Sequence, residues 1–211
     1  MTVGIGAFGP GAGAAILAAW AEAERCVAGD IGGFAVFCAI LPDAGPVSVE
    51  CQRVGLARIR REWDGTGLLD LMARATVAGV ITSGPDRAVP LAQFLPASRA
   101  GLVTGHRRPD RTDADGVPLN VAALRLLEAG TPPAEAVRRV TGANPELDAG
   151  LIAVTPDAIA LADTARVLRR TDRGQALIHA SGAGLAVLHN SIEPQAGYAG
   201  RIAEAGRAAF S

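Results

Sequence analysis

Residues 1–10 read MTVGIGAFGP, and the fold depends on what this opening stretch forms. Apolar and small residues alternate from Thr2 to Phe8, and Pro10 and Gly11 interrupt the pattern. The alternation predicts a short buried strand over 2–8. Removal of Met1 would make Thr2 the first residue, and a threonine with a free α-amine is a nucleophile with its own base. Thr2 is therefore either that nucleophile or only the first residue of a buried strand.

The rest of the chain predicts strands that come in hairpins rather than in regular alternation with helices. A helix is expected over 13–28, because Ile16, Trp20 and Ala23 fall on one apolar stripe. Further strands are expected over 32–41, 46–53, 77–84, 101–106 and 183–190, with a hairpin over 148–163. Further helices are expected within 68–75 and over 118–129, 132–141 and 195–209, the third of them capped by Thr131.

This order of elements favours an α+β or layered α/β fold with mixed, largely antiparallel sheets. The chain has 211 residues, of which 49% are hydrophobic, and it contains no long linker or internal repeat. A chain of this length can bury a sizeable core without disulfide or metal support. We therefore expect a single domain over 1–211.

Composition excludes several classes of function. All 20 basic residues are arginine, so no lysine is available for a Schiff base, a phosphate loop or a general base. The formal net charge of −1 does not indicate the basic surface that nucleic-acid binding requires. No apolar run is long enough to span a membrane, and no signal peptide is evident. Three widely spaced cysteines indicate a reducing cytoplasm rather than a disulfide framework.

A glycine-rich turn offers one candidate binding site. Gly4, Gly6 and Gly9 match the dinucleotide spacing, but only three residues precede Gly4, which leaves no room for the required strand. Gly9, Gly11 and Gly13 instead lie between the expected strand and the expected helix, where backbone amides could bind a small anion. Pro10 removes one of those amides.

No metal site or cofactor site emerges from the remaining motifs. None of His106, His179 and His189 pairs with another histidine or cysteine at metal-ligand spacing. Residues 111–122 fail as a calcium loop, because Arg111 and Ala122 occupy its two key ligand positions. His189 and Asn190 lie at the end of an expected strand, where functional side chains often project, although a capping or core-edge role is the more common one for a histidine in such a place.

The stretch GVPLNVAALRLLEAGTPPAEAVRRVTGANPELDAGLIAVTPDAIALADT, residues 116–164, resembles the central segment of the domain of unknown function 1028 family. It carries a Leu-Leu-x-x-Gly pattern, then a Pro-x-x-Ala helix, then a Gly-Leu-Ile-x-Val strand. MTVGIGAF is similar to the start of that family. The resemblance covers roughly residues 2–8 and 116–165. It implies a fold related to the N-terminal nucleophile hydrolases, a four-layer αββα sandwich of two stacked, mainly antiparallel sheets.

The resemblance also implies amide-bond cleavage, with Thr2 in the nucleophile position. His189, Asn190 or a backbone amide would then stabilise the oxyanion. Asp148 and Asn120 match positions inside the recurring segment without an assigned role. The missing lysine and the helix expected over 13–28 depart from the family pattern.

Two hypotheses follow from these observations. The chain is either an amidohydrolase acting through Thr2 on a small amide or peptide-like substrate, or a non-catalytic protein that binds a small anion or metabolite at Gly9–Gly13. Both take a small-molecule partner, and neither needs a cofactor or a metal. The resemblance implies a homodimer or higher homo-oligomer, and the catalytic hypothesis requires Thr2 to reach an accessible cleft.

Overall fold

The computed structural model describes residues 1–210 except 27–32, 54, 85 and 191–196. Within this part of the chain the strands form two antiparallel sheets. The first has six strands in the order β3-β2-β4-β1-β10-β9, and the second has four in the order β5-β6-β7-β8. Their bounds are β1 Thr2–Phe8, β2 Phe34–Leu41, β3 Gly45–Gln52, β4 Val77–Ser83, β5 Ala97–Ser98, β6 Gly101–Arg107, β7 Ala149–Val154, β8 Ile159–Asp163, β9 Arg173–Ala180 and β10 Ala183–Asn190.

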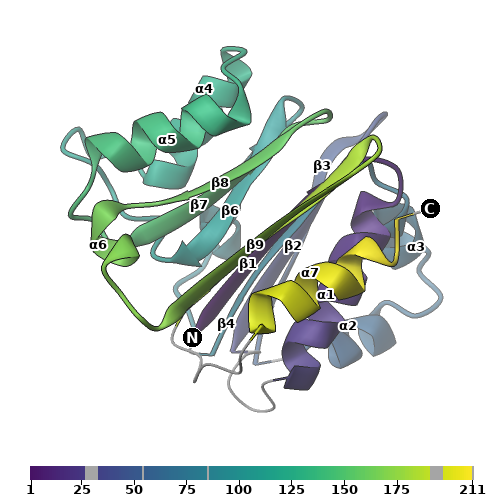
Figure 1. Cartoon of the computed structure of the whole chain (residues 1–211). Helices are drawn as coiled ribbons and strands as arrows, with labels where there is room; N and C mark the ends of the chain where they lie inside the picture. Colours follow the sequence, from purple (N-terminus) through teal and green to yellow (C-terminus); the bar gives the residue numbers. More distant parts are fainter. Residues whose placement is uncertain (27–32, 54, 85, 191–196, 211) are drawn as a thin grey trace.

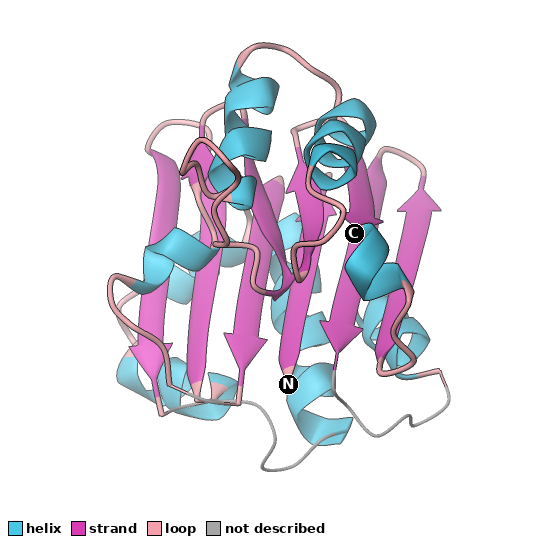
Figure 2. Cartoon of the chain, turned by 90° about the vertical axis from the view of Figure 1, so that its left-hand side faces the viewer, coloured by secondary structure: helices cyan, strands magenta, loops and turns pink. Residues whose placement is uncertain are grey.

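Helices cover the outer face of each sheet, so the molecule has four layers (Figure 1). The six-stranded sheet is covered by α1 (Ala12–Cys26), α2 (Leu56–Glu62), α3 (Leu68–Ala73) and α7 (Tyr198–Arg207). The four-stranded sheet is covered by α4 (Leu119–Glu128) and α5 (Pro133–Ala143). Two short helices, the 3-10 helix η1 (Leu91–Phe94) and α6 (Ala165–Leu168), lie in the connections. Figure 2 shows helices in front of and behind the strands. This is the αββα arrangement that the resemblance predicted.

Three apolar clusters hold the layers together. On β1, Val3, Ile5 and Ala7 face α1 and α7, so the apolar half of the alternating pattern forms the helix-side core. A second cluster lies between the sheets and combines Phe8 and Ile81 of the first sheet with Leu102, Ile152 and Val154 of the second. A third joins the second sheet to α4 and α5. Because β1 is buried on both faces, it forms the centre of the fold.

The other half of the β1 pattern, Gly4 and Gly6, lets the two sheets approach closely. A side-chain carbon on Gly4 would overlap the carbonyl oxygen of Gly105 on β6. One on Gly6 would lie 2.6 Å from Cγ2 of Val154 on β7. Only glycine fits at such contacts, since van der Waals packing between carbon atoms needs about 3.5 Å or more. The small residues of the opening stretch are therefore a packing requirement between the sheets.

The expected elements agree with the structure over most of the chain. The strand over 2–8, the hairpin over 148–163 and the helix pair over 118–141 are confirmed, and the expected helix over 13–28 ends at Cys26, with 27 and 28 outside the described residues. The prediction missed β5, β9, α2, α6 and η1. Thr131 does not cap α5: Pro132 holds that position, and no side chain bonds to the helix end. β9 was missed because the apolar Leu177 lies among its exposed residues, so apolar and polar residues do not alternate along it.

We expect Gly4→Ala to lower the free energy of unfolding by about 1–3 kcal/mol, because its methyl group must displace the Gly105 backbone. Chemical denaturation measures the change. Gly142→Ala is the matched control: a carbon there meets nothing within 4 Å, and it lies in α5, so it should stabilise the protein by about 0.5–1 kcal/mol. Equal stability of Gly4→Ala and the parent protein would contradict close contact between the sheets.

Candidate active site

Thr2 lies in a row of residues that crosses the first sheet on the face turned toward the second sheet. Thr2 pairs with Ser83 on β4 and with Asn190 on β10, and the row continues to Phe34 on β2 and Arg173 on β9. Side chains alternate between the faces of a strand, so Thr2 shares its face with Gly4, whose open side faces Gly105 of the second sheet. We call these five residues the Thr2 row.

Hydrogen bonds fix the hydroxyl of Thr2 and the peptide before it. Oγ1 of Thr2 donates to Oγ of Ser83 across 3.3 Å. Oγ of Ser83 in turn donates to the carbonyl oxygen of Met1 across 2.7 Å, and the backbone N–H of Gly84 donates to the same oxygen across 3.1 Å. With Met1 attached, Thr2 is only 4% exposed. This differs from the accessible cleft expected from the sequence: Thr2 lies between the sheets, but its side chain is covered.

A buried polar cluster bridges the two sheets at the β9 end of the Thr2 row. Nε2 of His106 on β6 lies 2.7 Å from Oδ1 of Asp163 on β8, and Oδ2 of that carboxylate lies 3.1 Å from Nη1 of Arg173. His106 reaches across Gly150 of β7, where any side chain would overlap both the ring and the carboxylate. A carboxylate offers only acceptor oxygens, so this hydrogen bond runs from Nε2–H of His106 to Asp163. Among the described residues Nδ1 has no hydrogen-bond partner.

His189 does not join Thr2, which corrects its expected role as an oxyanion donor. It pairs with Val3 and therefore lies on the helix side of the sheet, where its ring meets the edge of Tyr198 at a centroid distance of 4.9 Å. Burial, with the nearby charge of His106 as a second cause, lowers the pKa of His189 to about 4. Its neighbour Asn190, by contrast, lies beside Thr2 on the correct face.

Asp148 and Asn120 make structural contacts away from the hydroxyl of Thr2. The Asp148 carboxylate accepts a very short hydrogen bond from Nε of Arg107, whose backbone lies in the left-handed region at φ 62°. Nδ2 of Asn120, in the first turn of α4, donates to the Gln93 carbonyl oxygen across 2.7 Å. Both side chains hold loops around the second sheet.

The turn at Gly9–Gly13 gives no support to the anion-binding hypothesis. The N–H of Gly9 donates to the Thr76 carbonyl across 2.8 Å, and the N–H of Gly13 donates to the Ala75 carbonyl across 3.1 Å. A side chain on Gly13 would overlap the Met72 carbonyl. Gly9 and Gly11 have φ values of 103° and 79°, which favour glycine. These glycines therefore shape the turn and seat α1 against the end of α3.

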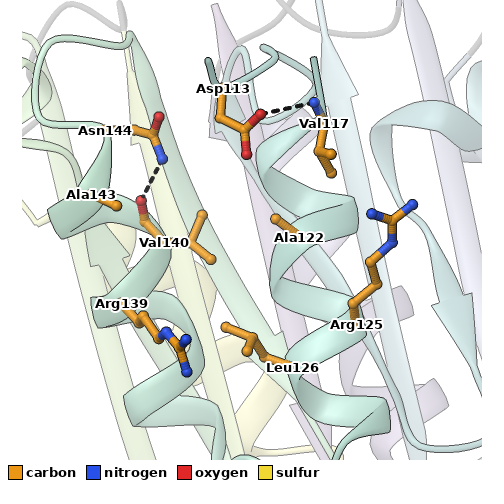
Figure 3. A pocket seen from close by; sticks show the side chains of 9 residues that line it. All are labelled: Asp113, Val117, Ala122, Arg125, Leu126, Arg139, Val140, Ala143 and Asn144. Carbon is orange, nitrogen blue, oxygen red and sulfur yellow. Dashed lines mark hydrogen bonds between the residues drawn. The ribbon is translucent and has the colours of Figure 1, made fainter. Parts of the chain in front are cut away.

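A groove of about 310 Å³ lies between α4 and α5 (Figure 3). Leu126 and Val140 line it together with Arg125 and Arg139, and Asn144 donates to the Val140 carbonyl at one end. It opens on the outer side of the helix layer, so the second sheet separates it from the Thr2 row. The groove holds no nucleophile beside a base, and it offers no route to amide chemistry.

Cysteine chemistry and metal chemistry find little support in the described residues. Burial raises the pKa of the Cys38 and Cys51 thiols to about 11, so neither is a thiolate nucleophile near neutral pH. Within the described ranges no group of three or more His, Cys, Asp or Glu side chains is placed to hold a metal ion.

None of the helices in the described part of the chain has the length and apolar character needed to cross a membrane.

The sequence model of one protein family, Domain of unknown function (DUF6963), matches residues 2–211. The chain belongs to that family. This corrects the resemblance to the domain of unknown function 1028 family, although both families lack an assigned function. No curated protein matches this DUF6963 chain.

Among solved structures, the DUF6963 chain is similar to glutamine phosphoribosylpyrophosphate (PRPP) amidotransferase from B. subtilis, complexed with ADP and GMP. The TM-score is 0.52 at 11% sequence identity, over 88% of this chain and 41% of that one. The chain thus spans less than half the length of the amidotransferase. At this identity the likeness shows a shared fold alone.

The low pKa of His189 makes stability depend on pH. The folded protein keeps this ring neutral to about pH 4, whereas an unfolded histidine takes up a proton near 6.5. Its contribution to stability is therefore complete above about pH 6.5 and is lost as the pH falls toward 4. His189→Phe keeps a ring against Tyr198 and removes the titration. Denaturation from pH 7 to 4 should show a shallower stability loss in the variant, by up to about 1.4 kcal/mol per pH unit. Parallel curves would contradict the assignment.

Proposed function

We propose that, once Met1 is removed, the chain hydrolyses a small amide or peptide-like substrate with Thr2 as the nucleophile. Oγ1 of Thr2 attacks the amide carbonyl carbon, and its proton passes to the freed α-amine of the same residue. The C–N bond then breaks, and the leaving amine takes that proton. Water hydrolyses the resulting ester and restores Thr2.

The observation that carries this proposal is the placement of Thr2. Its side chain lies at the end of the central strand of a rigid sheet, on the face between the sheets, 3.3 Å from the hydroxyl of Ser83. Strands on both sides fix the backbone, so the hydroxyl is pre-organised rather than carried on a loop. When Thr2 is the N-terminal residue, its α-amine lies next to its own hydroxyl and can accept the hydroxyl proton.

Removal of Met1 has two effects in this mechanism. It converts the backbone N–H of Thr2 into an amine that accepts a proton, and it takes away the Met1 carbonyl oxygen that the Ser83 hydroxyl and the Gly84 N–H bind. The 4% exposure of Thr2 belongs to the chain that still carries Met1. The Met1-bearing form is therefore expected to be inactive.

The cluster of His106, Asp163 and Arg173 supports the site as a positioning element. It ties the edge strand β9 of the first sheet to the edge strand β8 of the second, and Arg173 is itself part of the Thr2 row. The ion pair between Asp163 and Arg173 links the two sheets, and removal of one partner from a buried pair is costly. The similar solved structure is that of an amidotransferase, which agrees with amide chemistry.

We expect Thr2 to be the residue that reacts with an amide-directed electrophile. Protein that begins at Thr2, released from a cleavable fusion, should gain one adduct with a peptide β-lactone, and tandem mass spectrometry should place it on Thr2. Thr2→Ala and a chain with an uncleavable N-terminal extension should gain none, whereas Thr2→Ser should still react.

The intact mass of protein from its native host supplies the second test. A mass that lacks Met1 is expected. A population that retains Met1 throughout, or equal labelling of Thr2→Ala and the parent protein, would overturn the proposal.

A further inference from the structure

The carbonyl oxygen of Met1 is held by two donors from adjacent residues of the neighbouring strand. One is the N–H of Gly84 at 3.1 Å, which continues the ladder between β1 and β4 by one step. The other is Oγ of Ser83 at 2.7 Å, a side-chain donor that the ladder does not require. Resting on the proposed function, we infer that Ser83 Oγ and the Gly84 N–H stabilise the oxyanion at the Thr2 site, and that the Met1 carbonyl occupies the place of the substrate carbonyl.

Covalent geometry places the Met1 carbonyl group close to Oγ1 of Thr2, the proposed nucleophile. The Met1 carbonyl carbon is bonded to the nitrogen of Thr2, and attack on it by Oγ1 would close a five-membered ring. A substrate carbonyl within reach of Oγ1 can therefore bring its oxygen close to where the Met1 oxygen lies. Both donors already stand at the 2.7–3.1 Å separation that oxyanion donors show.

Removal of Met1 leaves these two donors without their acceptor. In the chain that carries Met1, Ser83 is fully buried and Gly84 is partly buried. Donors that lose their acceptor favour a ligand that brings an oxygen to the same place. A site prepared in this way selects a planar acyl carbonyl, and the Met1-bearing chain is blocked by its own peptide bond.

In this assignment the negative charge of the intermediate lies on the substrate oxygen, and the Thr2 α-amine holds the proton. When Oγ1 of Thr2 attacks, the carbonyl electron pair moves to oxygen, which accepts from Ser83 Oγ–H and the Gly84 N–H. Collapse of this intermediate restores the carbonyl and expels the amine, which carries off the proton held by the Thr2 α-amine. Both donors act in a buried site, where electrostatic stabilisation is stronger than in water.

Two electrophilic probes separate this role from a structural one. A peptide β-lactone acylates Thr2 through a tetrahedral alkoxide, whereas a matched peptide vinyl sulfone alkylates Thr2 without forming one. In protein that begins at Thr2, Ser83→Ala should slow acylation by about 100-fold and change alkylation little. Ser83→Thr, which keeps the hydroxyl, should acylate at close to the parent rate. Ser83→Cys, a weaker donor of similar size, should be intermediate.

Thr82→Val is the matched control. It removes a hydroxyl from the preceding residue of β4, which faces away from Thr2 and donates to the Phe34 carbonyl across 3.0 Å. It should leave both rates unchanged. If Ser83→Ala alters neither rate, or slows both equally, the oxyanion assignment is overturned while the nucleophile stands. If Thr2→Ala reacts as fast as the parent with both probes, the proposed function itself fails.

Discussion

Backbone contact between Gly4 on β1 and Gly105 on β6 is the constraint on which the rest of the structure depends. At most points in a stacked pair of sheets, interleaved side chains keep the backbones apart. Here Gly4 lets β1 approach the backbone of Gly105, and Gly150 on β7 leaves room for the contact between His106 and Asp163 above it. The central strand therefore has no side chain on its inner face between Phe8, which packs into the apolar core, and Thr2, which lies at the other end.

This contact separates the inner layer into an apolar part and a polar part. Beyond Gly6 the space between the sheets is filled by side chains such as Ile152 and Val154. On the other side of Gly4 lie polar side chains, Thr2 and Ser83 on the first sheet and His106 and Asp163 on the second, with Phe34 of the Thr2 row at the apolar cluster. Polar groups are costly to bury unless they are bonded. Here His106 bonds to Asp163, Asp163 bonds to Arg173 across the sheets, and Ser83 bonds to the Met1 carbonyl. The proposed nucleophile, the proposed oxyanion donors and the buried Asp163–Arg173 ion pair thus lie in the polar part that this packing arrangement creates.

The sequence predicted the central strand with Thr2 at its start and the hairpins, because each depends on local alternation, and the resemblance implied the layered fold. It could not predict that Ser83 would contact Thr2 or that His106 would contact Asp163. Ser83 is 81 residues away, and His106 and Asp163 are 57 residues apart, so register alone brings them together. The face of His189 was also undetermined, because the strand over 183–190 is buried on both sides and shows no alternation. The family resemblance led to the correct type of fold but to a different family of unknown function.

A crystal structure of the processed protein acylated by the β-lactone tests the central claim most directly. We predict an ester on Oγ1 of Thr2 whose carbonyl oxygen replaces that of Met1, within hydrogen-bonding distance of both Ser83 Oγ and the Gly84 nitrogen. An adduct on another residue, or an ester carbonyl turned away from both donors, would contradict the account.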